Sequence, residues 1–65
     1  MHELRERARR IVERVTQLSA ADAQQLLDRA GDVKTAIVVH HAKVTPETAR
    51  ERLASAGGSV RGALL

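Results

Sequence analysis

The apolar residues of this chain recur three and four positions apart, which is the spacing of an amphipathic helix. Arg7, Arg10 and Arg14 flank the first apolar stripe on one side. The stripe itself occupies an arc of about 120° in helical projection and consists of Leu4, Ala8, Ile11, Val12, Val15 and Leu18. The pattern predicts a first helix over residues 3–18, with the stripe facing a core.

Capping signals divide the remainder of the chain into further short helices. Gly31 and Gly57 suit the left-handed conformation that ends a helix. Four residues with side-chain oxygen acceptors are placed to serve as N-caps: Ser19, Asp32, Thr45 and Ser59. No segment alternates apolar and polar residues for long enough to predict a strand. We therefore expect an all-α bundle of about five short helices.

The chain also contains an internal repeat. The segment 19–37 aligns with 45–64 when one glycine is inserted in the second copy. Six aligned pairs are identical, namely Ala23/Ala49, Leu27/Leu53, Ala30/Ala56, Gly31/Gly57, Val33/Val60 and Ala36/Ala63. Each copy predicts a helix–glycine–helix hairpin, over 19–43 and 45–65. Because so short a hairpin cannot bury its apolar side alone, we expect both to pack with the first helix around one core, as a single domain over 1–65.

Composition makes that core small. The chain has 65 residues and contains no Phe, Tyr, Trp or Cys. An aliphatic core of this size favours support from a partner surface, and the lack of Cys excludes disulfides and thiolate metal sites. No apolar run reaches the ~20 residues of a membrane span, and no signal-peptide pattern opens the chain. We expect a cytoplasmic protein.

The residues that carry chemistry form no catalytic pattern. His40 and His41 are adjacent, so on a helix they point about 100° apart and do not chelate one metal. His40 is expected at the boundary of the core and His41 at the surface. There is neither a carboxylate pair in an expected cleft nor a phosphate-binding glycine loop after a strand. We predict no catalytic residue, no metal, no cofactor and no small-molecule ligand for this chain.

The expected third helix carries a second apolar group, Val38, Val39 and Ala42, on the side opposite to Val33 and Ile37. Two interpretations stay open. The helix is packed on both sides within the monomer, or the second group is an exposed strip that docks on a partner subunit or parent domain. With Arg7, Arg10 and Arg14, this strip forms the candidate interface.

The segment "RERARR" (5–10) raises the question of nucleic-acid binding, and the formal net charge is +3. Phosphate binding needs cations gathered on one face, commonly with aromatic residues for stacking. Here glutamates are interleaved with the arginines and aromatic residues are absent. Arginine stems beside an apolar stripe are explained more simply as side chains that extend the buried surface. A basic nucleic-acid binder is the least favoured function.

Three segments in order, "RARRIV", "AGDVKTAIV" and "VTPETARERLASAGGSVRGAL", resemble the C-terminal helical region of bacterial N-acetylmuramic acid 6-phosphate etherases. Glucokinase regulatory proteins share this region in more diverged form. "GDVKTAI" is also similar to the last turn and helix of ubiquitin-associated (UBA-like) three-helix domains. The resemblance implies a parent that is a cytoplasmic homodimeric lyase, which cleaves the D-lactyl ether of its substrate to N-acetylglucosamine 6-phosphate and D-lactate.

In that family the sugar-phosphate pocket and the acid/base glutamates lie in a preceding sugar-isomerase (SIS) domain. The resemblance therefore implies a non-catalytic accessory or dimerisation domain, as a homodimer or docked on a parent SIS domain. The family commonly opens this region with Asn-x-Lys-Leu near the pocket, whereas Met1-His2-Glu3-Leu4 stands here and only Leu4 matches. No ligand contact is carried over. The alternative is a free-standing helical interaction module that uses the third helix or the arginine-flanked first helix.

Overall fold

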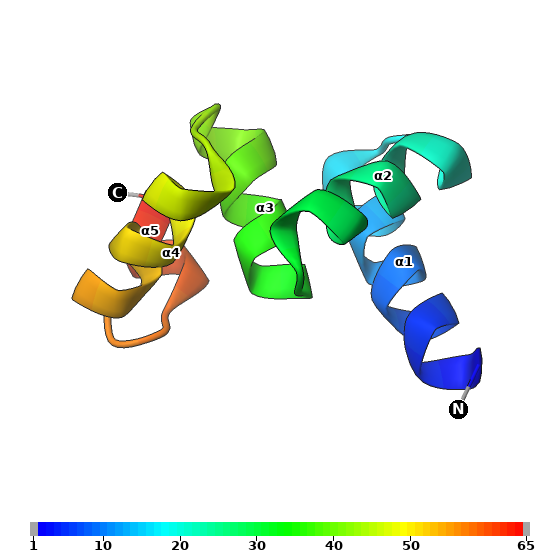
Figure 1. Ribbon diagram of the computed structural model, residues 1–65, viewed down its shortest axis with the longest axis horizontal. Coiled ribbons are helices and arrows are strands. Elements are labelled where there is room, and N and C mark those ends of the chain that lie inside the picture. The colour runs from blue at the N-terminus through cyan, green and yellow to red at the C-terminus, as the bar shows by residue number, and fades with distance from the viewer. Residues whose placement is uncertain (1, 65) are drawn as a thin grey trace.

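Five helices follow one another along the part of the chain that the structure describes (Figure 1). The computed structural model describes the backbone of residues 2–64 and the side chains of residues 6–64. The helices are α1 (His2–Thr16), α2 (Ala20–Ala30), α3 (Val33–Ala42), α4 (Pro46–Ser55) and α5 (Val60–Leu64). No strand occurs between residues 2 and 64, so the expected all-α bundle is confirmed.

The four expected N-caps are confirmed. In each, the side-chain oxygen accepts a hydrogen bond from the backbone N–H three residues later, at 2.7 to 3.2 Å. Pro46 follows the cap Thr45 at the start of α4, where a missing N–H costs nothing. These local bonds determine where four of the helices begin.

Glycines end α2 and α4 in different ways. Gly31 adopts φ 91° and closes α2. After α4, Gly57 and Gly58 have φ 67° and 86° and donate back to the carbonyls of Ala54 and Leu53 at 3.2 and 2.7 Å. This pair of bonds is a Schellman motif, which turns the chain sharply after a helix. Both glycine positions behave as the sequence predicts.

The helices form two lobes that share α3 (Figure 1). α1 and α2 contact each other and α3, and α4 and α5 likewise contact each other and α3. We call α1–α2–α3 lobe one and α3–α4–α5 lobe two. Because the lobes lie on opposite sides of one helix, the molecule is elongated, with extents of 31 × 22 × 17 Å.

Each lobe has its own hydrophobic core. The buried residues of lobe one are Val12, Ala23, Ala30 and Ala36. Those of lobe two are Val38, Ala49, Leu53 and Ala63. The sequence predicted one shared core, and this prediction is wrong because the structure has two. α3 lies between the two helix pairs and contributes Ala36 to the core of lobe one and Val38 to that of lobe two.

The repeat is longer than the sequence alignment indicated. In every identical apolar pair of the alignment, the first residue lies in the core of lobe one or packs against it, and the second does the same in lobe two. Val38 follows Val12 by 26 positions, and Val44 follows Leu18 by the same distance, with matching roles in the two lobes. The repeated unit is thus a three-helix lobe, in which α3 is both the last helix of lobe one and the first helix of lobe two.

Candidate functional site

α1 buries a narrower stripe than the sequence predicts. Val12 is fully buried and Thr16 nearly so, and the Thr16 hydroxyl donates to the Val12 carbonyl within the helix. Ile11 and Val15, expected in the core, are 48% and 42% exposed. α2 and α3 contact α1 and bury Val12 and Thr16 but cover Ala8 only partly, and the edge of the arc stays open. Leu4 and Glu3 lie outside the residues whose side chains the structure describes.

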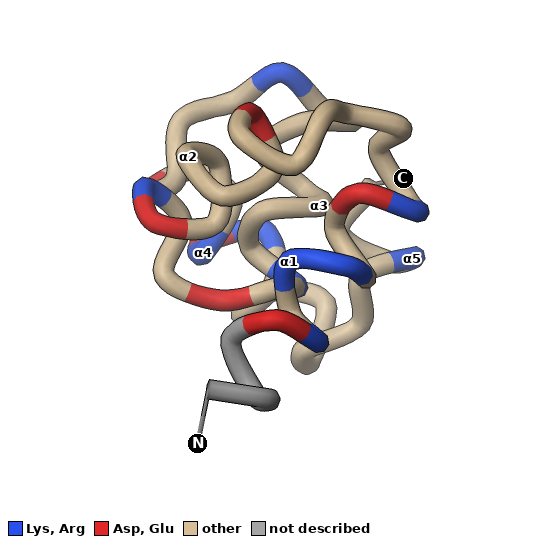
Figure 2. Tube along the Cα trace, turned by 90° about the vertical axis from the view of Figure 1, so that its right-hand side faces the viewer, with Lys and Arg blue, Asp and Glu red and all other residues tan. Residues whose placement is uncertain are grey.

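Arginines stand beside the two exposed apolar residues. Arg7, Arg10 and Arg14 are all exposed, and with Ile11 and Val15 they line an open hollow of about 310 Å³. We call these five residues the arginine face. Figure 2 views the molecule from the side on which α1 lies and shows basic and acidic positions interleaved along α1, so the helix as a whole is not a purely basic element.

Two ion pairs form along α1, Arg9 with Glu13 at 3.3 Å and Arg10 with Glu6 at 4.0 Å. Both are solvent-accessible i,i+4 pairs, which contribute at most about 1 kcal/mol each. Arg10 is therefore held weakly, and its guanidinium remains accessible to a partner.

The second apolar group of the third helix, for which two interpretations were open, is largely covered within the chain. Val38 is fully buried in the core of lobe two, and Val39 and Ala42 are partly buried against that core. Because α4 and α5 cover this side of α3, Val38 is not exposed at the surface of the single chain. Of the two interpretations left open by the sequence, the structure has the helix packed on both sides.

His40 and His41 lie side by side near the end of α3. His40 is partly buried and His41 exposed, with ring centroids 5.3 Å apart and ring planes at 83°. Among the described residues, no group of three His, Cys, Asp or Glu side chains is placed to hold a metal ion.

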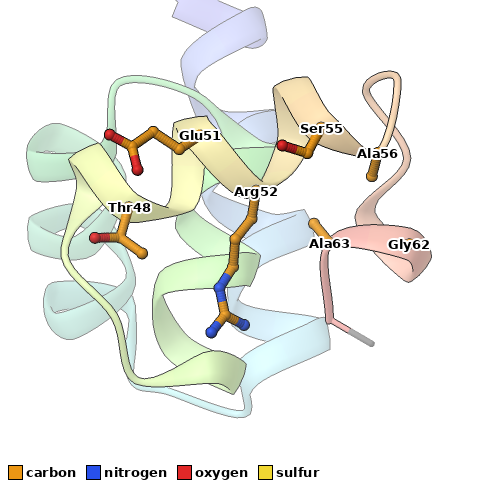
Figure 3. Close-up of a pocket in the computed structure, with 7 residues that line it drawn as sticks. All are labelled: Thr48, Glu51, Arg52, Ser55, Ala56, Gly62 and Ala63. Carbon is orange, nitrogen blue, oxygen red and sulfur yellow. The ribbon is translucent and has the colours of Figure 1, made fainter.

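A second hollow, of about 440 Å³, opens between α4 and α5 (Figure 3). It is lined by Thr48, Glu51, Arg52, Ser55, Ala56, Gly62 and Ala63. Figure 3 shows the Glu51 carboxylate and the Arg52 guanidinium extending in different directions. The hollow is open to solvent and its charged groups do not converge, so it does not resemble a binding pocket for a polar ligand.

The carboxylates of the described part of the chain lie mostly at the surface. Glu13 is half-buried, and every other carboxylate from Glu6 onward is exposed. Catalytic carboxylates are usually desolvated or paired in a cleft, which gives them different roles. No described helix combines the length and apolar character needed to cross a bilayer.

The fold and these surfaces define a small all-α domain of two repeated three-helix lobes, with an exposed arginine face on its first helix. The proteins to which it is similar carry one name, N-acetylmuramic acid 6-phosphate etherase. The etherase of Rubrobacter xylanophilus is 52% identical over 62 residues, which are 94% of this chain and 20% of the relative. That of Geobacillus thermodenitrificans is 47% identical over 62 residues, 94% of the chain and 21% of the relative.

The etherase of Rhodopirellula baltica is 43% identical over 53 residues, 80% of the chain and 18% of the relative. The chain thus spans about a fifth of the length of these relatives and resembles their C-terminal part. No protein-family model matches the chain, and no solved structure matches it significantly. The likeness to ubiquitin-associated domains therefore stays a prediction.

Proposed function

We propose that this chain is a non-catalytic helical accessory domain of an etherase-like protein that cleaves N-acetylmuramic acid 6-phosphate. One observation carries the proposal: the similarity covers 94% of this chain but only about a fifth of an etherase. A segment that matches nearly end to end, and whose relatives are five times longer, is expected to work as part of a larger protein. The proposal includes the cytoplasmic setting in which such a protein acts.

The chemistry of the described residues supports a structural role. Ether cleavage by proton transfer requires acid and base groups positioned at the bond that breaks. The carboxylates between Glu6 and Glu51 are exposed or half-buried. The two that line one open hollow, Asp28 and Asp32, are both exposed. In this proposal the reaction takes place in a separate catalytic domain of the SIS type, and the helical domain packs against it.

Charge favours docking over self-association through the arginine face. A two-fold symmetric interface pairs a surface with a copy of itself. Pairing two arginine faces would bring two sets of Arg7, Arg10 and Arg14 together, and such like-charge contacts are unfavourable. If the parent protein is a dimer, as the resemblance implies, another surface makes the dimer contact.

A chimaera tests the proposal. The segment of the R. xylanophilus etherase that matches this chain is replaced by residues 1–65, and D-lactate release from N-acetylmuramic acid 6-phosphate is measured. We expect the chimaera to retain activity within about tenfold of the parent, and deletion of the segment to cost about 10²-fold or more, because a misplaced catalytic domain loses its geometry. The isolated chain is expected to release no D-lactate.

Matched variants of the chimaera separate packing from surface effects. Val38→Asp, which places a charge in the core of lobe two, should reduce activity as deletion does, whereas Gln25→Asp, at an exposed position of α2, should not. D-lactate production by the isolated chain would disprove the non-catalytic role. A soluble but inactive chimaera would disprove the accessory role.

A second candidate function is a free-standing helical module that binds another protein. The exposure of Ile11 and Val15 beside three arginines favours it, because buried interface centres are apolar and arginine is enriched there. In this case the isolated chain binds its partner without any catalytic domain.

A further inference from the structure

The internal repeat allows the arginine face of α1 to be compared with the equivalent face of α3. α1 occupies in lobe one the place that α3 occupies in lobe two, 26 positions later. At this spacing Arg7, Arg10, Ile11, Arg14 and Val15 correspond in order to Val33, Ala36, Ile37, His40 and His41. The arginine face of α1 is therefore equivalent to one defined face of α3.

On α3, helices cover the N-terminal part of that face, whereas His40 is partly buried and His41, the equivalent of Val15, is exposed. Ala36 is fully buried in the core of lobe one, Val33 packs against the same core, and Ile37 is 9% exposed. The elements that cover it are α1 and α2. On α1, Ile11 is 48% exposed although it matches the buried Ile37. In lobe one, packed helices thus cover the α3 positions equivalent to Arg7, Arg10 and Ile11, whereas no described helix covers these residues on α1.

The residue differences between the two faces indicate the charge of a helix that could pack against the arginine face. Where α3 has Val33 and Ala36, α1 has Arg7 and Arg10. A second copy of the chain would oppose these cations with its own arginine face in a symmetric pair. A helix with carboxylates at the facing positions would complement them, and such complementarity sets specificity and association rate.

The apolar part of the face is too small to act alone. Ile11 and Val15 are its only apolar members, whereas a stable interface buries about 800 Å² on each partner. Charge pairing must therefore contribute, which again favours an acidic partner over a purely apolar one.

We propose that the arginine face docks an acidic amphipathic helix, which places two apolar side chains one turn apart against Ile11 and Val15 and carboxylates against Arg7, Arg10 and Arg14. This deepens the second candidate function and rests on its docking role, but not on the assignment to an etherase.

The test uses the isolated chain and three synthetic peptides of about 18 residues, long enough for an alanine-based helix to form. The first carries Leu at i and i+4 with four Glu beside them, the second has Gln in place of Glu, and the third has Lys. Binding is followed by chemical shifts of the ¹⁵N-labelled chain at low and high salt. We expect the Glu peptide to bind, with shifts centred on Ile11 and Val15, and the Gln and Lys peptides to bind at least tenfold more weakly. Higher salt should weaken the Glu complex.

Charge-reversal variants locate the site. Arg7→Glu/Arg10→Glu/Arg14→Glu should weaken the Glu peptide at least tenfold and favour the Lys peptide. Arg29→Glu/Arg52→Glu/Arg61→Glu, which reverses three exposed arginines on α2, α4 and α5, should leave binding within about twofold if docking is confined to α1. Thermal melts of both triple variants check that the fold is retained.

Several results would overturn the proposal. The first is a Kd for the Glu peptide weaker than about 1 mM, and the second is a Gln peptide that binds as tightly as the Glu peptide. The third is an equal loss of peptide affinity in both triple variants. The fourth is tighter binding of the chain to duplex DNA or to phosphatidylserine vesicles than to the Glu peptide. A dimer in sedimentation equilibrium that Ile11→Ser dissociates would overturn it too, and would identify a second copy as the occupant. Since the chimaera assay reads D-lactate and this assay reads peptide binding, either proposal can fail while the other stands.

Discussion

Two residues without the freedom of glycine adopt left-handed backbone conformations, Gln17 with φ 61° and Lys43 with φ 56°. They stand 26 positions apart, directly after the ends of α1 and α3, so they are equivalent in the repeated lobes. In L-residues this conformation costs about 1–2 kcal/mol. The cost is tolerated because the tight turns that follow position the caps Ser19 and Thr45.

Replacing Lys43 with glycine should relieve this strain. We expect Lys43→Gly to raise the free energy of unfolding by about 0.5–1 kcal/mol, since the greater freedom of glycine in the unfolded chain offsets part of the gain. The measurement is urea denaturation followed by circular dichroism at 222 nm.

The matched control introduces the same strain elsewhere. Gly57 has φ 67°, and a Cβ built there would meet no atom within 4 Å. Gly57→Ala should therefore lower stability by about 1 kcal/mol through backbone strain alone. A destabilised Lys43→Gly variant would show that the lysine side chain contributes more than its backbone conformation costs.

One side chain joins the two lobes directly. The guanidinium of Arg50 on α4 donates to the Ala30 carbonyl at the end of α2, at 2.9 Å. A cation at the C-terminal end of a helix is also favoured by the helix dipole. We expect Arg50→Met to lower the free energy of unfolding by about 0.5–1 kcal/mol, measured by urea denaturation.

Arg52→Met provides the comparison, because Arg52 lies on the same helix at the α4–α5 hollow and a surface change of this kind is usually within about 0.5 kcal/mol. Equal losses in the two variants would mean that arginine stems on α4, and not the bond to Ala30, account for the effect.

At the scale of elements, α3 is the helix on which the fold depends. It has ten residues, and four of them, Thr35, Ala36, Ile37 and Val38, are buried in succession. Four consecutive residues span all sides of a helix, so the middle of α3 is covered on every side, while Lys34 and His41 near its ends are exposed. α1, in contrast, has one buried side and leaves the arginine face open.

Shortening Val38 tests this difference. Val38→Ala should lower the free energy of unfolding by about 2 kcal/mol, because it leaves a cavity in the core of lobe two. For a domain of this size the loss corresponds to roughly 8–16 °C in Tm, which differential scanning calorimetry measures directly.

Val15→Ala removes the same atoms from the 42% exposed edge of α1 and should change stability by no more than about 0.5 kcal/mol. Similar effects of the two substitutions would contradict the burial of Val38 and restore the idea of an exposed strip on α3.

At the scale of the whole molecule, the sharing of α3 couples the lobes. Neither lobe keeps its core if α3 unfolds, since Ala36 belongs to one core and Val38 to the other. Repeat proteins show the same nearest-neighbour coupling between stacked units. Two independently folding halves are therefore not expected.

We predict a single unfolding transition with equal calorimetric and van't Hoff enthalpies. Val12→Ala in lobe one and Val38→Ala in lobe two should both shift this one transition to lower temperature. Two resolved transitions, or a Val12→Ala variant that loses amide protection only in α1 and α2 during hydrogen exchange, would show that the lobes unfold separately.

Much of the fold was predictable from the sequence because its signals are local. The caps Ser19, Asp32, Thr45 and Ser59 bond to residues three positions away, so their role follows from spacing alone. Gly31 and Gly57 end helices for reasons of backbone sterics that need no partner. The duplicated apolar pairs, and with them the resemblance to etherases, are likewise readable without coordinates.

Tertiary structure decided which apolar residues are covered. A helical projection gives the direction of Ile11, Val15 and Val38 but says nothing about whether another helix stands there, and burial depends on that neighbour. α4 and α5 cover Val38, while the described helices leave Ile11 and Val15 open. The division into two cores arose for the same reason, because only packing reveals that one helix of ten residues serves both lobes.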